Sequence, residues 1–114
     1  MIDVSKYIGK SYKEYTCYGL FRAIQADLGY DLPDYEAGTP CKNAEKIELE
    51  LLHKYKKLEQ PVEGCGVVIY DCGFPCHIAL YIGEGKIVHS KKDTGVVITD
   101  LSQEKVYGYY GVRQ

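Results

Sequence analysis

The sequence predicts an α+β domain in which N-terminal helices pack on an antiparallel β-meander. Apolar residues recur at helical spacing in the first half of the 114-residue chain, whereas from residue 66 onward short β-branched runs are separated by glycine-containing turns. Helices that precede the strands, rather than alternate with them, favour segregated α and β layers. At this length we expect a single domain over residues 1–114, built around one core.

Two helices are predicted after a short helix or turn at about residues 3–8. The first begins near Cys17, and its apolar side chains share one face: Leu20, Phe21, Ile24 and Leu28. Gly29 is suited to end this helix as its C′ residue. The second is expected over residues 43–58, where apolar side chains recur at helical spacing: Ile47, Leu51, Tyr55 and Leu58.

The β-region is expected to contain five strands: Val67–Tyr70, His77–Ile82, Lys86–His89, Val96–Thr99 and Val106–Val112. Side chains two residues apart in a strand share a face, so Ile78, Leu80 and Ile82 should enter the core while His77 points to the opposite side. His89 lies on the second strand of a hairpin that turns at Gly83-Glu84-Gly85. Pairing of these two strands should therefore bring the two imidazoles close together on one face.

Cys17 and the two histidines offer the groups of a cysteine hydrolase in the order nucleophile, base and orienting group. In the first helical turn, unpaired N–H groups and the helix dipole favour a thiolate, so we expect the pKa of Cys17 to lie below its ordinary value. The same N–H groups can stabilise an oxyanion. Without the histidines, such a cysteine would be interpreted as a small buried apolar residue.

Two segments resemble the NlpC/P60 family of cysteine peptidases. Thr16-Cys17-Tyr18-Gly19-Leu20 is similar to the family's nucleophile segment, and the run from His77 to His89 is similar to its histidine hairpin without a gap. Gly9-Lys10-Ser11-Tyr12 resembles the family's Gly-x-Pro-Tyr. The resemblance spans nearly the whole chain.

Three positions depart from the family pattern. Thr16 stands where the family usually has Asp, Ser11 stands for Pro, and Cys65-Gly66 occupies the place of a Gly-Asp pair. None of these changes removes a catalytic group. The resemblance therefore still implies a papain-like core that cuts peptidoglycan stem peptides at or near a γ-D-glutamyl bond, with no metal and no cofactor.

The resemblance also implies the site residues. Cys17 is the expected nucleophile, His77 the general base and His89 the residue that orients it. Tyr12 and Tyr18 flank the nucleophile in sequence, and we expect them to bind substrate. The same site would also serve an acyltransferase or a deamidase, which the sequence does not distinguish from a hydrolase.

The five cysteines leave a non-catalytic alternative open. They stand at positions 17, 41, 65, 72 and 76, and an odd number leaves at least one free thiol. Cys65, Cys72, Cys76 and His77 could ligate zinc in a Cys-rich interaction module, but paired Cys-x2-Cys knuckles are missing. We therefore favour ordinary thiols and predict no metal site.

Charge and hydropathy exclude two classes of partner. The net charge is −2, from 14 basic and 16 acidic side chains, so there is no basic excess to neutralise nucleic acid. No run is apolar enough to span a membrane, and residues 1–6 lack the pattern of a signal peptide. We expect synthesis in the cytoplasm, with delivery to a wall substrate by a phage tail or another delivery machine.

Overall fold

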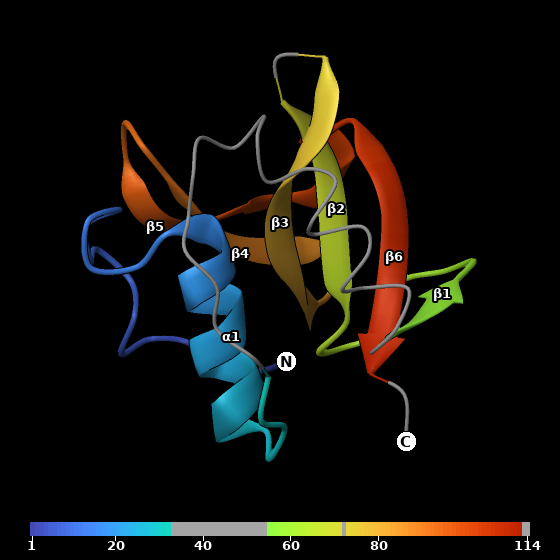
Figure 1. The fold of residues 1–114 in the computed structure, drawn as a ribbon, viewed down its shortest axis with the longest axis horizontal. Helices are drawn as coiled ribbons and strands as arrows, with labels where there is room; N and C mark the ends of the chain where they lie inside the picture. Colours follow the sequence, from blue (N-terminus) through green and yellow to red (C-terminus); the bar gives the residue numbers. More distant parts are fainter. Residues whose placement is uncertain (33–54, 72, 113–114) are drawn as a thin grey trace.

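The computed structural model describes residues 1–32, 55–71 and 73–112, in which one α helix packs on a six-stranded antiparallel sheet (Figure 1). A short 3₁₀ helix spans Leu101–Gln103. The main elements are α1 (Cys17–Asp27), β1 (Tyr55–Leu58), β2 (Gly66–Asp71), β3 (Phe74–Gly83), β4 (Lys86–Lys91), β5 (Gly95–Asp100) and β6 (Val106–Val112). The predicted α+β class and the five predicted strands are confirmed.

Helix α1 begins and ends where the sequence predicts. The hydroxyl of Thr16 accepts the N–H of Gly19 at 3.1 Å, which satisfies one of the free donors of the first turn. At the other end Gly29 has a φ of +97°, and the N–H of Tyr30 donates to the carbonyl of Gln25 at 2.9 Å. This is a Schellman motif with Gly29 at C′. Before the helix, residues 5–9 form turns rather than a helix.

The strands follow the order β1-β6-β2-β3-β4-β5. The meander from β2 to β5 is as predicted, but β6 does not extend it. Instead β6 returns to the opposite edge and pairs with β2, with Val67 opposite Tyr109. The sequence does not encode this return locally, since it depends on pairing between strands distant in the chain.

The predicted second helix is wrong over its last four residues. Residues 43–54 of that prediction lie outside the described residues, whereas Tyr55–Leu58 form strand β1. Leu58 lies opposite Tyr109 in an antiparallel ladder with β6. Pairing with the edge of β6 satisfies backbone N–H and C=O groups of this segment. The pairing depends on a strand that is distant in the sequence, so tertiary context overrides the helical spacing of the side chains.

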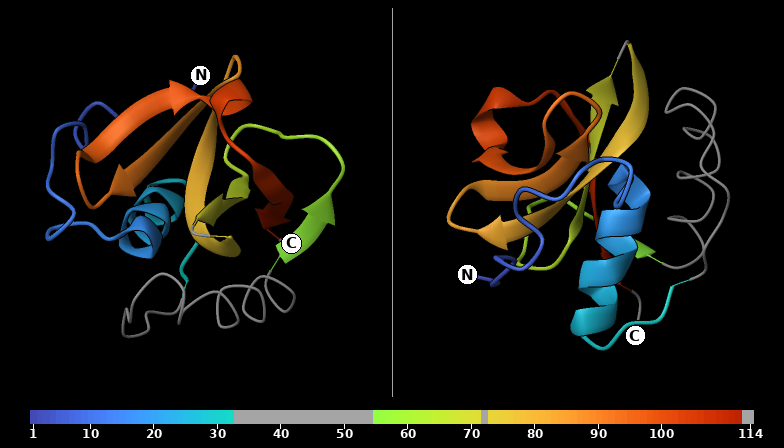
Figure 2. Two further views of the ribbon diagram at one scale, coloured as in Figure 1. Left: turned by 90° about the horizontal axis from the view of Figure 1, so that it is seen from above. Right: turned by 90° about the vertical axis from the view of Figure 1, so that its left-hand side faces the viewer.

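Apolar residues fill both faces of a strongly curled sheet. In Figures 1 and 2, β4 and β5 run across the direction of β2, β3 and β6, so the sheet wraps around its own inner face. On the outer face α1 packs against the predicted core side chains Ile78, Leu80 and Ile82. The inner face holds a second apolar cluster: Cys65, Val67, Ile69, Ala79 and Ile87. The alternation predicted for β3 is confirmed, and it assigns His77 to the inner side.

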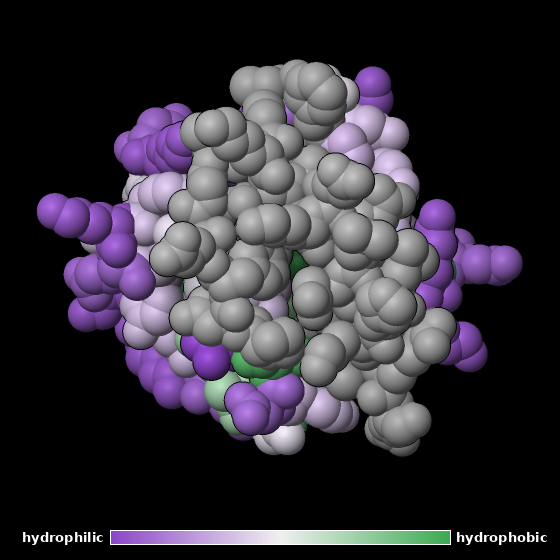
Figure 3. All heavy atoms as spheres, in the orientation of Figure 1, coloured by the Kyte–Doolittle hydropathy of each residue, from purple (hydrophilic) through white to green (hydrophobic). Residues whose placement is uncertain are grey.

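On the face seen in Figure 3, the coloured atoms around the periphery are mostly hydrophilic. In the described ranges no helix has the length and apolar character needed to cross a membrane.

The N-terminal segment is tied to β5 by a close backbone contact at Gly95. Val96 donates its N–H to the Lys10 carbonyl at 2.9 Å, and Gly95 has a φ of +74°. A Cβ at Gly95 would clash with that carbonyl oxygen. We expect Gly95→Ala to lower the free energy of unfolding by about 2 kcal/mol or more, because backbone strain and a steric clash add.

Urea unfolding of Gly95→Ala beside Gly85→Ala tests this expectation. Gly85 has the same φ of +74°, but nothing lies within 4 Å of the position of its Cβ. The loss of unfolding free energy in Gly85→Ala therefore measures the cost of the backbone conformation alone. The additional loss in Gly95→Ala measures the cost of the clash with the Lys10 carbonyl. Equal losses in the two variants would contradict the close approach to Lys10.

Candidate active site

Cys17 is the first residue of α1 and lies beneath the surface, with 7% of its area exposed. The backbone N–H groups of Ile78 and Tyr18 and the hydroxyl of Tyr12 lie close enough to its sulfur to lower the pKa of the thiol by hydrogen bonding. Two of these donors come from the helix start and the segment before it, while the third comes from β3. The thiol therefore bridges the helix and the sheet.

A break in the sheet makes room for this contact. The ladder between β3 and β4 has its last pair at Leu80 and Val88, although both strands continue beyond it. The N–H of Tyr81 points to the β2 side, where it donates to the Cys65 carbonyl at 2.9 Å. Successive N–H groups of a strand alternate in direction, so that of Ile78 points to the β4 side, beyond the end of the ladder. It donates to the Cys17 sulfur instead of to a strand partner.

His77 and His89 form a hydrogen-bonded pair next to this gap. The Nε2 atom of His77 lies 2.7 Å from the Nδ1 atom of His89, and the ring centroids are 5.0 Å apart. His89 is only 1% exposed, whereas His77, which precedes Ile78, is partly buried. The prediction that the hairpin brings the two imidazoles together is confirmed.

Thr99 extends the pair on the third strand of the meander. Its hydroxyl lies 2.9 Å from the Nε2 atom of His89, so both ring nitrogens of His89 have partners. No motif in the sequence singles out Thr99. The strand register could have indicated it, if residues are paired outward from the β4–β5 turn. In that register His89 lies opposite Val97 and Ile87 lies opposite Thr99, so Thr99 is a diagonal neighbour of His89 on the same face.

Burial keeps both histidines neutral at pH 7. Desolvation is the largest effect, and it lowers the pKa of His77 and of His89 below the ordinary value. Each is lowered further by the positive charge of Lys91, and the pKa of His89 also by the neighbouring His77. The carboxylate of Asp71 raises the pKa of His77, which offsets part of the loss.

The expected lowering of the Cys17 pKa is not found. Burial raises the pKa of this thiol above its ordinary value, and the hydrogen bonds from Ile78, Tyr18 and Tyr12 reduce the increase. The position at a helix start was visible in the sequence, but the depth of burial was not. The thiol of Cys17 and the imidazole of His77 are therefore both neutral in the resting structure.

The two tyrosines that the sequence predicts at the site have different surroundings. The hydroxyl of Tyr12 reaches the sulfur of Cys17, and burial raises the pKa of this hydroxyl. Tyr18 contributes its backbone N–H to the sulfur, while its ring packs against Phe21, with centroids 6.5 Å apart. Of the two tyrosines, Tyr12 is therefore the residue whose side chain contacts the sulfur of Cys17.

Cys65 lies apart from the thiol at position 17. It is 2% exposed in the inner apolar cluster, and burial raises the pKa of its thiol. Cys41, Cys72 and the side chain of Cys76 lie outside what the structure describes. Among the residues that it does describe, no three His, Cys, Asp or Glu side chains are grouped so as to hold a metal ion.

A comparison with protein families gives a match over nearly the whole chain. The model of the NlpC/P60 family matches residues 5–112, which include both segments of the sequence resemblance. No curated protein matches the chain.

Proposed function

We propose that this chain, which belongs to the NlpC/P60 family, is a cysteine peptidase that hydrolyses stem peptides of the bacterial cell wall. Proteins of the family are generally cysteine peptidases or amidases that act on wall peptides. The observation that carries the proposal is the 2.7 Å contact between His77 and His89, next to the residue whose N–H binds the Cys17 sulfur. A nucleophile, a base and an orienting group are thereby gathered around one gap in the sheet.

The contact between the two histidines is compatible with the proton positions that the reaction requires. The Nε2 atom of His77 is engaged with His89, so Nδ1 is the nitrogen that remains to accept the thiol proton. A neutral imidazole carries one proton, and for Nδ1 to act as a base that proton must reside on Nε2. His77 then donates to Nδ1 of His89, which holds the ring of the base in position.

The proposed reaction is acyl transfer to sulfur. His77 takes the proton of Cys17, and the thiolate attacks the amide carbonyl to form a tetrahedral oxyanion. Backbone N–H groups at the start of α1 stabilise this oxyanion. The imidazolium of His77 protonates the leaving amine, and neutral His77 then activates the water that releases the acyl group.

Burial gives the reaction a specific order. The pKa of the thiol is raised and that of His77 is lowered, so a persistent ion pair is disfavoured in the free site. Proton transfer would then accompany attack on the substrate. Tyr12, whose hydroxyl donates to the sulfur, would stabilise the developing thiolate and border the bound peptide.

The finer features of the proposal come from the family resemblance. They are a papain-like core, one catalytic domain over residues 1–114, substrate contacts by Tyr12 and Tyr18, and cleavage at or near the γ-D-glutamyl bond to a diamino acid. Delivery by a phage tail or another machine stays a prediction.

Digestion of purified muropeptides tests the proposed reaction. We expect new amino termini in the wild-type digest by mass spectrometry, unchanged activity in EDTA, and loss of activity after alkylation with iodoacetamide, since the mechanism needs a thiol and no metal. A product that carries an added acceptor would identify an acyltransferase, and a mass increase of one unit without cleavage would identify a deamidase. Unfolding on chelation, with release of zinc, would support the interaction module instead.

A further inference from the structure

We infer that Thr99 is a positioning residue that sets the tautomers of both histidines and so keeps Nδ1 of His77 free of a proton. The inference deepens the proposed function, because it assigns the group that prepares the base. It rests on two consecutive contacts: His77 Nε2 to His89 Nδ1 at 2.7 Å, and His89 Nε2 to Thr99 Oγ1 at 2.9 Å.

Two proton arrangements are compatible with these contacts when both rings are neutral. In the first, Nε2–H of His77 donates to His89, and Nε2–H of His89 donates to the Thr99 hydroxyl. In the second, the Thr99 hydroxyl donates to Nε2 of His89, and Nδ1–H of His89 donates to His77. Only the first leaves the Nδ1 lone pair of His77 available as a base.

The Thr99 hydroxyl supports the first arrangement, because without it that arrangement would contain an unpaired buried donor. His89 is 1% exposed, so its Nε2–H has no access to bulk water. If the hydroxyl were absent, the first arrangement would leave that N–H buried and unpaired, whereas the second would leave only an unpaired lone pair. Orphaned buried N–H groups are the rarer and costlier of the two. Loss of the hydroxyl therefore shifts the pair toward the arrangement that cannot accept the Cys17 proton.

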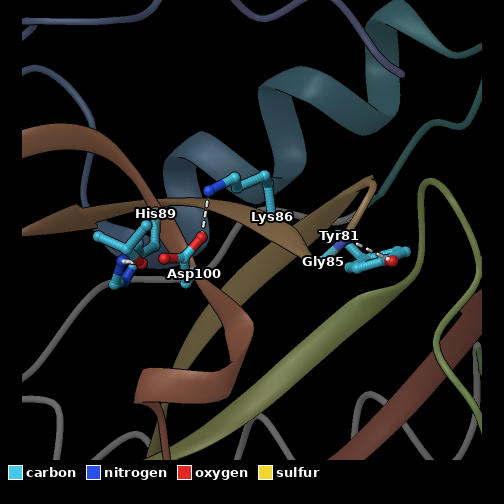
Figure 4. Close-up of polar contacts among 6 residues, drawn as sticks. Tyr81, Gly85, Lys86, His89 and Asp100 are labelled. Atoms are coloured by element: carbon cyan, nitrogen blue, oxygen red, sulfur yellow. Dashed lines mark hydrogen bonds and ion pairs between the residues drawn. The ribbon is translucent and has the colours of Figure 1, made fainter.

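The β4–β5 ladder holds Thr99 in place for this role. Thr99 lies opposite Ile87 and His89 lies opposite Val97, so the contact between His89 and Thr99 is a diagonal one on the inner face. Lys86 and Asp100 form an ion pair at the end of the same two strands (Figure 4). The six residue pairs of this ladder follow one another without a register shift, so Thr99 keeps its place relative to His89.

Three variants isolate the hydroxyl. Thr99→Val keeps the shape of the side chain but removes the hydroxyl, and Thr99→Ser restores it. Thr94→Val is the matched control, because Thr94 is exposed on the same hairpin and its hydroxyl contacts the neighbouring Gly95 carbonyl. If Thr99→Val does not fold, Thr99→Ala removes the same hydroxyl and takes its place.

The first measurement is the ¹⁵N NMR spectrum of the imidazole nitrogens, which reports the tautomer of each ring and needs no substrate. In wild type and Thr99→Ser we expect Nδ1 of His77 to be unprotonated and Nε2 protonated. In Thr99→Val the signals of both rings should move toward the opposite tautomer, and in Thr94→Val they should not move.

The second measurement is muropeptide turnover. We expect Thr99→Val to lower kcat by about tenfold with KM nearly unchanged, since the loss of one hydrogen bond to a buried group acts on the base rather than on substrate binding. Thr99→Ser should recover most of that loss. Unchanged tautomers in Thr99→Val would overturn the inference, whatever happens to activity. Shifted tautomers without any wild-type turnover would uphold the inference and reject the hydrolase.

Discussion

Replacement of Cys17 by Ser is expected to leave the fold intact and to lower turnover of wall peptides by roughly 10⁴-fold or more. A serine hydroxyl can accept the same N–H of Ile78, so the gap between β3 and β4 keeps its polar occupant. Its pKa is far higher than that of a thiol, and burial would raise it further, as it does for Cys17. Neutral His77 is too weak a base for that proton. Muropeptide digestion followed by mass spectrometry measures the loss.

The matched control is Cys65→Ala, which removes the other described buried thiol without touching the gap. We expect this variant to remain active without treatment. Iodoacetamide should then abolish its turnover, and the alkylated residue should be Cys17. If Cys17→Ser cleaves at a rate near that of wild type, or if Cys65→Ala is the inactive variant, the nucleophile has been assigned to the wrong cysteine.

His77→Ala should have the next largest effect, with a fall in kcat of roughly 10³-fold, because it removes the group that carries the proton in both steps. His89→Asn should retain more activity. Its amide oxygen can accept the Nε2–H of His77, which preserves the orientation of the base at some cost in packing.

The order of the two histidine variants is the decisive result, with circular dichroism used to establish that both are folded. His89→Gln serves as a longer amide that reaches closer to the original position of the ring nitrogen. If His89→Asn and His89→Gln are as inactive as His77→Ala, the two rings share the role of base, and the proposed division between base and orienting group is wrong.

Local patterns in the sequence predicted the elements that depend on local chemistry. Helix α1 was predicted from its apolar face and from Gly29, and both act in the structure as expected. The strands from β2 to β5 follow from alternation and turns. Strand β1 could not be predicted in this way, because Tyr55 and Leu58 fit a helical spacing and only pairing with β6 makes their segment extended.

In the candidate site, too, features that depend on local sequence could be predicted, whereas features that depend on tertiary packing could not. The hairpin that joins His77 and His89 is local, so their proximity was predictable. The sign of the Cys17 pKa shift was not, because helix position is visible in the sequence whereas burial arises only from the packing of α1 on the sheet. The contact from His89 to Thr99 required the register of β5, which a search for motifs does not supply.

The break in the ladder between β3 and β4 means that the Cys17 sulfur would lose its place if the sheet were completed. If the two strands zipped past Leu80 and Val88, the N–H of Ile78 would find a strand partner and the sulfur would be expelled. Ser90 opposes that closure, because its hydroxyl donates to the carbonyl of Tyr15, two residues before Cys17. The segment that precedes Cys17 therefore helps to keep this ladder open, and full backbone pairing and the present position of the thiol exclude each other.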